Sequence, residues 1–279
     1  MANDTMKEIV AKKKERLALA KQTVPEEEMK LRAGSGVAPR PFMEAVARPR
    51  QISLIAEIKK RSPSAGMLVE DFVPAAIAAQ YKEAGAQAIS VLTEEDFFLG
   101  KPEYIQEVKT ACDLPVLRKD FLLEPYHVYE SRALGADAIL LISELLSKDA
   151  IAQMLEISFR LGMAALIEAH SDKELKKVLG IKVPVPEEML KKAAKGKQYI
   201  PFLVGINNRD LRTLQTDFKT TEQLYPLVPK DKPVVVESGI RSYQDVLFLK
   251  VLGVGAVLVG ESILKSPDRK EAILDLMGW

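Results

Sequence analysis

The sequence predicts an α/β fold, a (β/α)8 TIM barrel with extra helices in front of it. From residue 52 onward, short apolar and β-branched runs alternate with longer helical patterns, as in repeated βα units. Eight strand candidates follow one another at the spacing of βαβ units, roughly 30 residues. The chain length of 279 residues is also normal for such a barrel.

The expected strands are 52–58, 88–92, 115–117, 138–142, 164–167, 202–206, 234–237 and 256–259. Helical stretches lie between them, among them 74–84, 102–111, 125–134 and 148–160. Several of these begin with proline, which suits the first turn of a helix because an N–H there has no intrahelical partner. The runs AGAQAI, LGADAI and LGVGAV each end a helix with glycine and enter a strand, as in a parallel sheet.

A six-stranded doubly wound sheet is the rival fold, but eight strands and the lack of Gly-x-Gly-x-x-Gly after the first favour the barrel. We expect residues 1–279 to form a single (β/α)8-barrel domain, with 1–49 as an N-terminal helical extension. Residues 1–22 set Ile9, Val10, Leu17 and Leu19 among many charges, which suggests an amphipathic helix outside the barrel. Residues 33–49, rich in Gly and Pro, indicate a linker around a short helix.

Net charge, cysteine content and the length of the apolar runs limit the classes of function that this protein can have. Forty basic and thirty-nine acidic residues give a net charge of +1, which offers no electrostatic footprint for nucleic acid or a membrane surface. The one cysteine, Cys112, excludes an intramolecular disulfide and fits a reducing compartment, so a cytoplasmic protein is expected. No apolar run reaches the roughly 18 residues of a membrane span. We expect a monomer or a weak homo-oligomer.

Polar residues follow six of the eight expected strands, at the barrel end that carries active sites. In strand order they are Glu57 and Lys59 with 60–64; Arg118, Lys119 and Asp120; Glu168; Asn207, Asn208 and Arg209; Glu237, Ser238 and Gly239; and Gly260, Glu261 and Ser262. One charge at a strand end is usually solvated or ion-paired. Charges from six strands above apolar interiors indicate a catalytic site instead.

The loops VESGI and VGESI, after the last two strands, carry a second signal. Both place small residues where a loop meets a helix start, and exposed N–H groups there can bind phosphate. Ordinary turn glycines are the alternative. Two such loops on adjacent strands favour the phosphate interpretation, and therefore a phosphorylated small-molecule ligand.

Seven motifs, in order, resemble the indole-3-glycerol-phosphate synthase family over nearly the whole chain. They are IAEIKKRSPSAG, VLTEEDFFLG, PVLRKDFLLEPY, LIEAH, GINNRDLRTL, VESGI and VLVGESIL. The resemblance implies ring closure, decarboxylation and dehydration of 1-(o-carboxyphenylamino)-1-deoxyribulose 5-phosphate, with no metal or organic cofactor. The segment 181–201 departs from the family, where a short joint suffices, and its centre is expected to be helical on the barrel face opposite the chemistry.

The resemblance also implies roles for single residues. Lys119 matches the general acid, Lys59 a lysine that contacts the substrate carboxylate, and Glu168 an acid or base in dehydration; the division of proton transfers among the three stays open. The implied substrate-binding residues are Glu57, Ser62, Asn207, Arg209, Glu237, Ser238, Gly239, Gly260, Glu261 and Ser262. Phe98, Phe121 and Leu140 fit either a wall against the aromatic ring or ordinary core.

Two other functions compete. A phosphoribosylanthranilate isomerase needs a Cys and an Asp at strand ends, and Cys112 follows an expected helix instead. A barrel that binds phosphate without turnover does not need the lysines and the glutamate that accompany the loops here.

Overall fold

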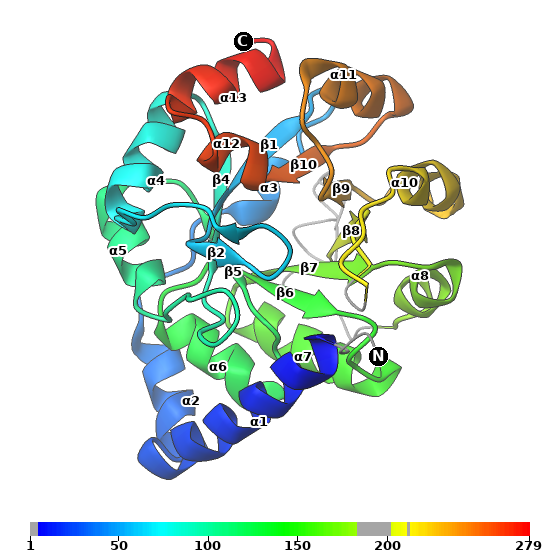
Figure 1. Ribbon diagram of the computed structural model, residues 1–279. Coiled ribbons are helices and arrows are strands. Elements are labelled where there is room, and N and C mark those ends of the chain that lie inside the picture. Colours follow the sequence, from blue (N-terminus) through cyan, green and yellow to red (C-terminus); the bar gives the residue numbers. More distant parts are fainter. Residues whose placement is uncertain (1–4, 183–201, 211–212) are drawn as a thin grey trace.

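The computed structural model describes residues 5–182, 202–210 and 213–279. In this part of the chain eight parallel strands form a closed barrel (Figure 1), in the order β1-β10-β9-β8-β7-β6-β5-β4. The strands are β1 (Ser53–Ile58), β4 (Ala88–Leu92), β5 (Val116–Lys119), β6 (Ala138–Ile142), β7 (Ala164–Ala169), β8 (Leu203–Asn207), β9 (Val234–Glu237) and β10 (Ala256–Val259). Because β1 pairs with both β4 and β10, the predicted TIM barrel is confirmed and the doubly wound sheet is wrong.

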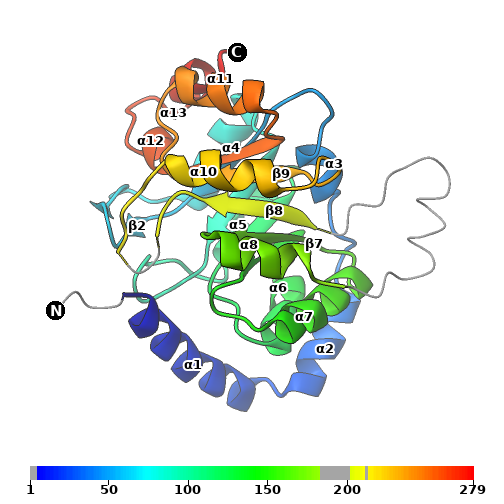
Figure 2. The same cartoon turned by 90° about the vertical axis from the view of Figure 1, so that its right-hand side faces the viewer.

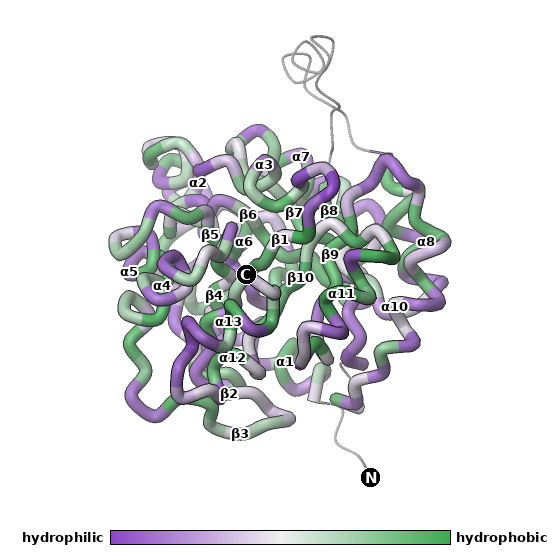
Figure 3. Tube along the Cα trace, turned by 90° about the horizontal axis from the view of Figure 1, so that it is seen from above, coloured by the Kyte–Doolittle hydropathy of each residue, from purple (hydrophilic) through white to green (hydrophobic). Residues whose placement is uncertain are grey.

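Helices surround the barrel on its outside (Figure 1). They are α4 (Pro74–Glu83), α5 (Tyr104–Ala111), α6 (Pro125–Ala133), α7 (Lys148–Arg160), α8 (Asp172–Leu179), α10 (Lys219–Leu224) with the 3-10 turn η1 (Tyr225–Leu227), α11 (Tyr243–Leu252), α12 (Glu261–Leu264) and α13 (Arg269–Met277). The hydropathy colouring of Figure 3 shows hydrophobic strands at the centre and helices that alternate between hydrophilic and hydrophobic segments. In α4 the buried residues Pro74, Ile77, Ala78 and Tyr81 recur at helical spacing, so this helix packs one side against the barrel.

Four strands and α7 have the bounds that the sequence predicts, and the other predicted elements differ by a few residues. The three helix-to-strand joints contain Gly85, Gly135 and Gly253 at φ values of 91°, 90° and 102°. This left-handed conformation costs residues with a Cβ atom energy, which explains the glycines. At Gly253 a Cβ would also lie 2.7 Å from Tyr225 Oη.

Side chains alternate between two hydrophobic clusters along the strands. Ile55, Leu117 and Leu258 belong to the cluster inside the barrel, whereas Leu54 and Val116 belong to the cluster between barrel and helices. Because successive residues of a strand point to opposite faces, each inward column continues in steps of two residues. The residue two positions beyond the last inward apolar one therefore faces the barrel mouth.

The N-terminal extension consists of α1 (Thr5–Thr23), α2 (Glu26–Ser35) and α3 (Phe42–Val46). Figure 2 shows α1 along the lower side of the barrel, with its beginning toward the side where β2 lies. Phe42 and Val46 of α3 join the inner barrel cluster. The Arg40 guanidinium donates to the carbonyl oxygens of Lys109, Cys112 and Leu114.

Several details of the extension and the loops differ from expectation. Helix α2 occupies part of the expected linker, and Leu19 of α1 is exposed rather than packed. The loop after β1 forms a short antiparallel hairpin of β2 (Arg61–Ser62) and β3 (Gly66–Met67), which no sequence pattern predicted. The expectation for 181–201 falls almost entirely outside the described residues. In the described ranges, no helix is both long and apolar enough to span a membrane.

Candidate active site

A cavity of about 460 Å³ lies at the C-terminal ends of the strands. Every residue named from the sequence as catalytic or substrate-binding lines it. They are Glu57, Lys59, Ser62, Lys119, Glu168, Asn207, Arg209, Glu237, Ser238, Gly239, Gly260, Glu261 and Ser262. Phe98, Phe121 and Leu140 line the same cavity. The structure thus brings the predicted residues together, while their roles stay predictions.

The alternation of the strands explains this convergence. Inward Ile55 is followed two residues later by Glu57, inward Leu117 by Lys119, and inward Val235 by Glu237. The same step leads from Leu166 to Glu168. Apolar side chains thus fill the lower barrel, and charged side chains occupy the next inward position at the mouth.

Lys119 lies between two buried carboxylates. Its Nζ is 2.9 Å from Glu237 Oε2 and 3.4 Å from Glu168 Oε2. Burial disfavours the ammonium, but the nearby carboxylates of Glu237, Glu168 and Glu57 outweigh it and raise the pKa of Lys119 above its usual range. Lys119 is therefore a charged ammonium group held by two carboxylates.

The pKa values of the two carboxylates that contact Lys119 are shifted in opposite directions. Burial raises the pKa of Glu237 to about 7, against the effect of Lys119 and with that of the neighbouring Glu168 anion. Burial also disfavours the Glu168 anion, but Lys119, His170 and Asn207 together hold the pKa of Glu168 well below its ordinary value. Two neighbouring carboxyl groups whose pKa values are shifted in opposite directions are typical of acid–base sites. Glu237 Oε1 is buried and has no hydrogen-bond partner among the described residues.

Two neighbours of these carboxylates escaped the sequence analysis. His170 Nε2 lies 3.0 Å from Glu168 Oε1, and His170 Nδ1 lies 3.9 Å from Glu144 Oε2. Burial opposes protonation of His170, but the two carboxylates raise its pKa. Gly205 leaves room for the carboxylates, because a Cβ there would lie 2.9 Å from Glu237 Oε1. The two-residue step from Glu168 to His170 in LIEAH was the available signal.

Lys59, the second lysine of the site, pairs with Glu57 at the end of the same strand. Lys59 Nζ contacts Glu57 Oε2, and the carbonyl oxygen of Glu57 accepts a hydrogen bond of 3.1 Å from Tyr81 Oη. Gly260 permits this placement, because a Cβ on it would lie 2.4 Å from Glu57 Oε2. The glycine of the last loop is therefore required by close approach.

Arg209 joins three parts of the cavity rim. Its backbone N–H donates to Asn207 Oδ1 at 2.9 Å, and its guanidinium contacts Ser64 Oγ of the hairpin loop and Glu261 Oε2 of α12, the latter at 3.3 Å. Asn207 Nδ2 in turn donates to Glu168 Oε1 at 2.8 Å. A planar guanidinium at this rim suits a carboxylate ligand.

The two glycine-containing loops meet at one end of the cavity. Ser238 and Gly239 both have positive φ, 66° and 81°, and α12 begins directly after Gly260. Ser262 Oγ donates to the carbonyl oxygen of Ile240 at 3.2 Å, which ties the loops together. First-turn N–H groups have no acceptor inside their helix, so this end can bind an anion.

The other end of the cavity is apolar. The rings of Phe98 and Phe121 lie 6.2 Å apart at an angle of 38°, and Leu92, Leu140 and Ile142 complete the wall. Phe98, Phe121 and Leu140 line the cavity and also belong to, or pack against, the cluster inside the barrel, so both of the weighed placements apply to them.

Two of the strand-end residues, Arg118 and Asn208, were wrongly expected at the mouth. Asn208 Oδ1 accepts a hydrogen bond of 2.7 Å from Thr221 Oγ1 of α10. Arg118 points outward and donates to Glu130 Oε2 at 2.7 Å and Ser131 Oγ at 3.1 Å, both on α6. It neighbours Lys119 on the strand, so the two side chains must point to opposite faces.

The closed barrel and the cavity at its C-terminal face, with a charged lysine between two carboxylates, are the features of a (β/α)8-barrel enzyme. The family model of indole-3-glycerol phosphate synthase matches residues 6–276. The chain belongs to the indole-3-glycerol phosphate synthase family.

Individual relatives in sequence belong to the same family. An indole-3-glycerol phosphate synthase from Acidovorax sp. (strain JS42) is 42% identical, covering 98% of this chain and 99% of the relative. One from Geobacillus thermodenitrificans is 44% identical over 86% of each chain. Among solved structures, 3-hexulose-6-phosphate synthase from Salmonella typhimurium has a TM-score of 0.57 at 14% identity, covering 81% of this chain and 97% of its own, and it supports the fold alone.

Proposed function

We propose that this chain converts 1-(o-carboxyphenylamino)-1-deoxyribulose 5-phosphate to indole-3-glycerol phosphate, carbon dioxide and water. The observation that carries the proposal is the placement of Lys119, held as a cation between Glu168 and Glu237. The cavity has an anion-binding end and an apolar end on either side of this lysine, which suits a substrate with a phosphate at one end and an aromatic ring at the other.

Lys119 is the general acid of ring closure. The aromatic carbon that carries the carboxylate attacks the ketone carbon, and Lys119 donates its proton to the oxygen on which negative charge develops. Loss of carbon dioxide then restores the aromatic ring. Departure of the new hydroxyl group as water, with loss of a ring proton, completes the indole.

Glu168 and Lys59 serve the later proton transfers. The lowered pKa of Glu168 makes it an anion at neutral pH, which suits a base in dehydration. Lys59, aligned by Glu57, faces the substrate carboxylate together with Arg209. Asn207 fixes the Glu168 carboxylate, and Glu237 fixes Lys119.

The phosphate and the ribulose hydroxyls occupy the opposite end. Backbone N–H groups of the loops 238–239 and 260–262 hold the phosphate, with Ser62 at the ribulose side. The proposed reaction uses no cofactor. A cytoplasmic location, as a monomer or weak homo-oligomer, fits the single buried thiol of Cys112 and the near-zero net charge.

Turnover of this substrate, followed by fluorescence of the indole product, tests the proposal. Lys119→Ala is expected to leave substrate binding measurable and to lower kcat by roughly 10²-fold or more. Lys82→Ala, which removes an exposed lysine paired with Asp113, is the matched control and keeps wild-type turnover. A folded Lys119→Ala variant within a few-fold of wild type would show that the general acid lies elsewhere. Isomerisation of phosphoribosylanthranilate by the wild-type protein would favour the rival enzyme.

A further inference from the structure

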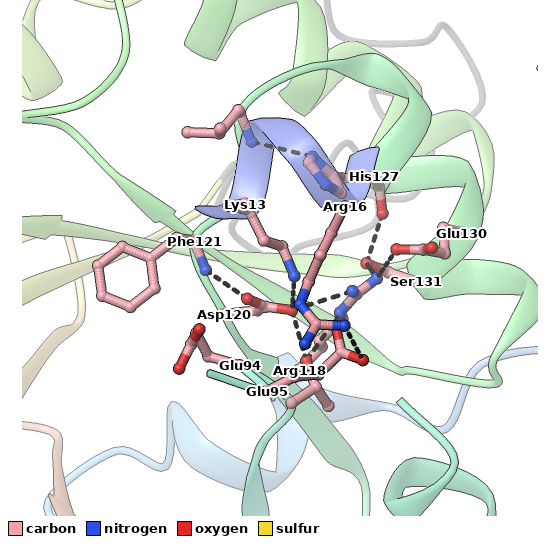
Figure 4. A network of polar contacts seen from close by, with 12 residues as sticks. Lys13, Arg16, Glu94, Glu95, Arg118, Asp120, Phe121, His127, Glu130 and Ser131 are labelled. Carbon is pink, nitrogen blue, oxygen red and sulfur yellow. Dashed lines mark hydrogen bonds and ion pairs between the residues drawn. The ribbon is translucent and has the colours of Figure 1, made fainter. Parts of the chain in front are cut away.

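Two cations of α1 reach the loops of the barrel mouth from outside the barrel. Figure 4 shows Lys13 pointing from the helix toward Asp120, and Arg16 toward the loop of Glu94 and Glu95. Lys13 Nζ lies 2.6 Å from Asp120 Oδ2, and the Lys13 side chain is only 6% exposed. Lys13 and Arg16 are three positions apart and therefore lie on the same side of the helix.

Asp120 connects Lys13 to the active site. In the chain it stands between Lys119 and Phe121, which both line the cavity. Its Oδ1 accepts the Phe121 backbone N–H at 2.8 Å. Its Oδ2 accepts from Lys13, from Thr93 Oγ1 at 2.7 Å and from Arg118 Nη2 at 3.0 Å. The conformation of the chain at Phe121 thus depends on a carboxylate that Lys13 helps to hold.

Arg16 holds the neighbouring loop, which follows β4. Its guanidinium contacts both carboxylate oxygens of Asp96, at 2.6 and 2.9 Å, and Glu95 Oε1 at 2.9 Å. Within that loop the Glu94 carboxylate accepts the backbone N–H groups of residues 96, 97 and 98, at 2.8 to 3.0 Å. Phe98, at the end of the loop, forms the apolar wall with Phe121.

Attachment of the extension does not by itself require these cations. Leu17 and Met29 pack with Tyr126 of α6, and Tyr126 Oη donates to the carbonyl oxygens of Ala20 and Val24. Arg40 binds the barrel further along. Burial of an ammonium costs desolvation energy, and an apolar side chain of similar size often serves stability as well or better. A buried lysine aimed at one carboxylate therefore suggests a role in placing that carboxylate.

We propose that Lys13 and Arg16 are positioning residues of the active site, which hold the loops of Phe121 and Phe98 and so shape the wall for the aromatic part of the substrate. Lys13 additionally fixes the chain directly after Lys119. The inference rests on the proposed function for the identity of the substrate, but the placement of the loops is testable without turnover.

Amide hydrogen exchange of the full chain tests the placement. The backbone N–H groups of Phe97, Phe98 and Phe121 are reporters, since each donates to a loop carboxylate. Lys13→Met is expected to raise exchange about tenfold in 119–122, and Arg16→Met in 94–98, with the barrel strands unchanged. The control Lys21→Met removes an ion pair of the same helix with Glu124, away from the cavity lining, and leaves both segments at wild-type exchange.

Kinetics test the consequence for catalysis. Lys13→Met is expected to lower kcat/KM about tenfold, because a small misplacement of reacting groups is costly. Inhibition by inorganic phosphate should stay at the wild-type level, because phosphate binds at the other end of the cavity. Lys13→Arg should recover part of the loss. Lys21→Met, which leaves Lys13 and Arg16 in place, keeps kcat/KM within a few-fold.

Two outcomes would overturn the proposal. One is a Lys13→Met variant whose exchange rises throughout the chain, as a merely structural contact would predict. The other is a loss of kcat/KM no larger than in Lys21→Met. Local loosening in a protein whose wild type turns over no substrate would support the positioning role and refute the proposed function instead.

Discussion

Replacement of Lys119 by methionine is expected to destabilise the protein more at pH 8 than at pH 5.5. Methionine keeps the length of the side chain but removes the cation that faces Glu168 and Glu237. Without the cation, burial disfavours the charged forms of both carboxyl groups, and their pKa values rise. The charge state of the pair at each pH then decides how much stability is lost.

The sign follows from the two pKa shifts of the native protein. The pKa of Glu237 is raised to about 7, so folding favours its protonated form, and its contribution to stability falls as pH rises from its ordinary 4.5 to 7. The pKa of Glu168 is lowered, so its anion contributes stability above its ordinary value, and this is lost as pH falls below it. At pH 5.5 Glu237 is protonated with or without Lys119, and only Glu168 loses a partner. At pH 8 both anions lose it.

Loss of one partner of a buried ion pair costs about 3–5 kcal/mol. Because the site opens into a cavity, we expect the lower end, about 3 kcal/mol, at pH 8. Protonation of one carboxyl relieves about 1.4 kcal/mol per pKa unit, so the loss at pH 5.5 should be smaller by about 1–2 kcal/mol.

Urea unfolding at the two pH values measures the difference, with wild type as the reference at each. Lys82→Met, in an exposed pair with Asp113, should change stability little at either pH. Equal destabilisation of Lys119→Met at pH 5.5 and pH 8 would refute the idea that the lysine balances two unequal carboxylates. The double variant Lys119→Met/Glu237→Gln should regain part of the loss at pH 8.

Further changes test other parts of the molecule. Gly260→Ala would put a Cβ 2.4 Å from Glu57 Oε2, and steady-state kinetics should show kcat/KM lower by roughly 10²-fold. Inorganic phosphate should inhibit competitively, and Gly239→Val, at φ +81° and with Thr216 2.8 Å from the new Cβ, should weaken that inhibition; unchanged inhibition would place the anion elsewhere. Arg40→Ala removes three hydrogen bonds to carbonyl oxygens and should lower stability by about 2 kcal/mol while kcat/KM stays the same.

Local patterns in the sequence were enough for the barrel and for the polar residues at its mouth. Strands such as 138–142 and 256–259 are short apolar runs after a helix-ending glycine, so their bounds could be predicted from neighbouring residues alone. The charged side chains that follow them interrupt this pattern, and parallel strands bring their ends to one face of a barrel.

The features that the sequence did not reveal depend on contacts between distant residues or on the direction in which a side chain points. Lys13 and Asp120 are 107 positions apart, and no local periodicity connects a charged residue of α1 with a strand end. Arg118 was misplaced because strand-end residues were grouped by position without applying the alternation of the strand. The β2–β3 hairpin has two residues per strand, mostly exposed, which is too short for a hydrophobic pattern.

The pairing of β1 with β10 has a consequence for how the protein is made. One edge of β1 stays without its partner from the synthesis of Ser53 until Ala256–Val259 has left the ribosome. An unpaired strand edge can pair with another chain, so nascent molecules are open to aggregation during this interval. The Leu54 and Ile55 side chains are fully buried in the finished barrel. Until the barrel closes, β1 lacks the strand that covers one of its edges, so the order of synthesis leaves the first strand of the barrel exposed for longest.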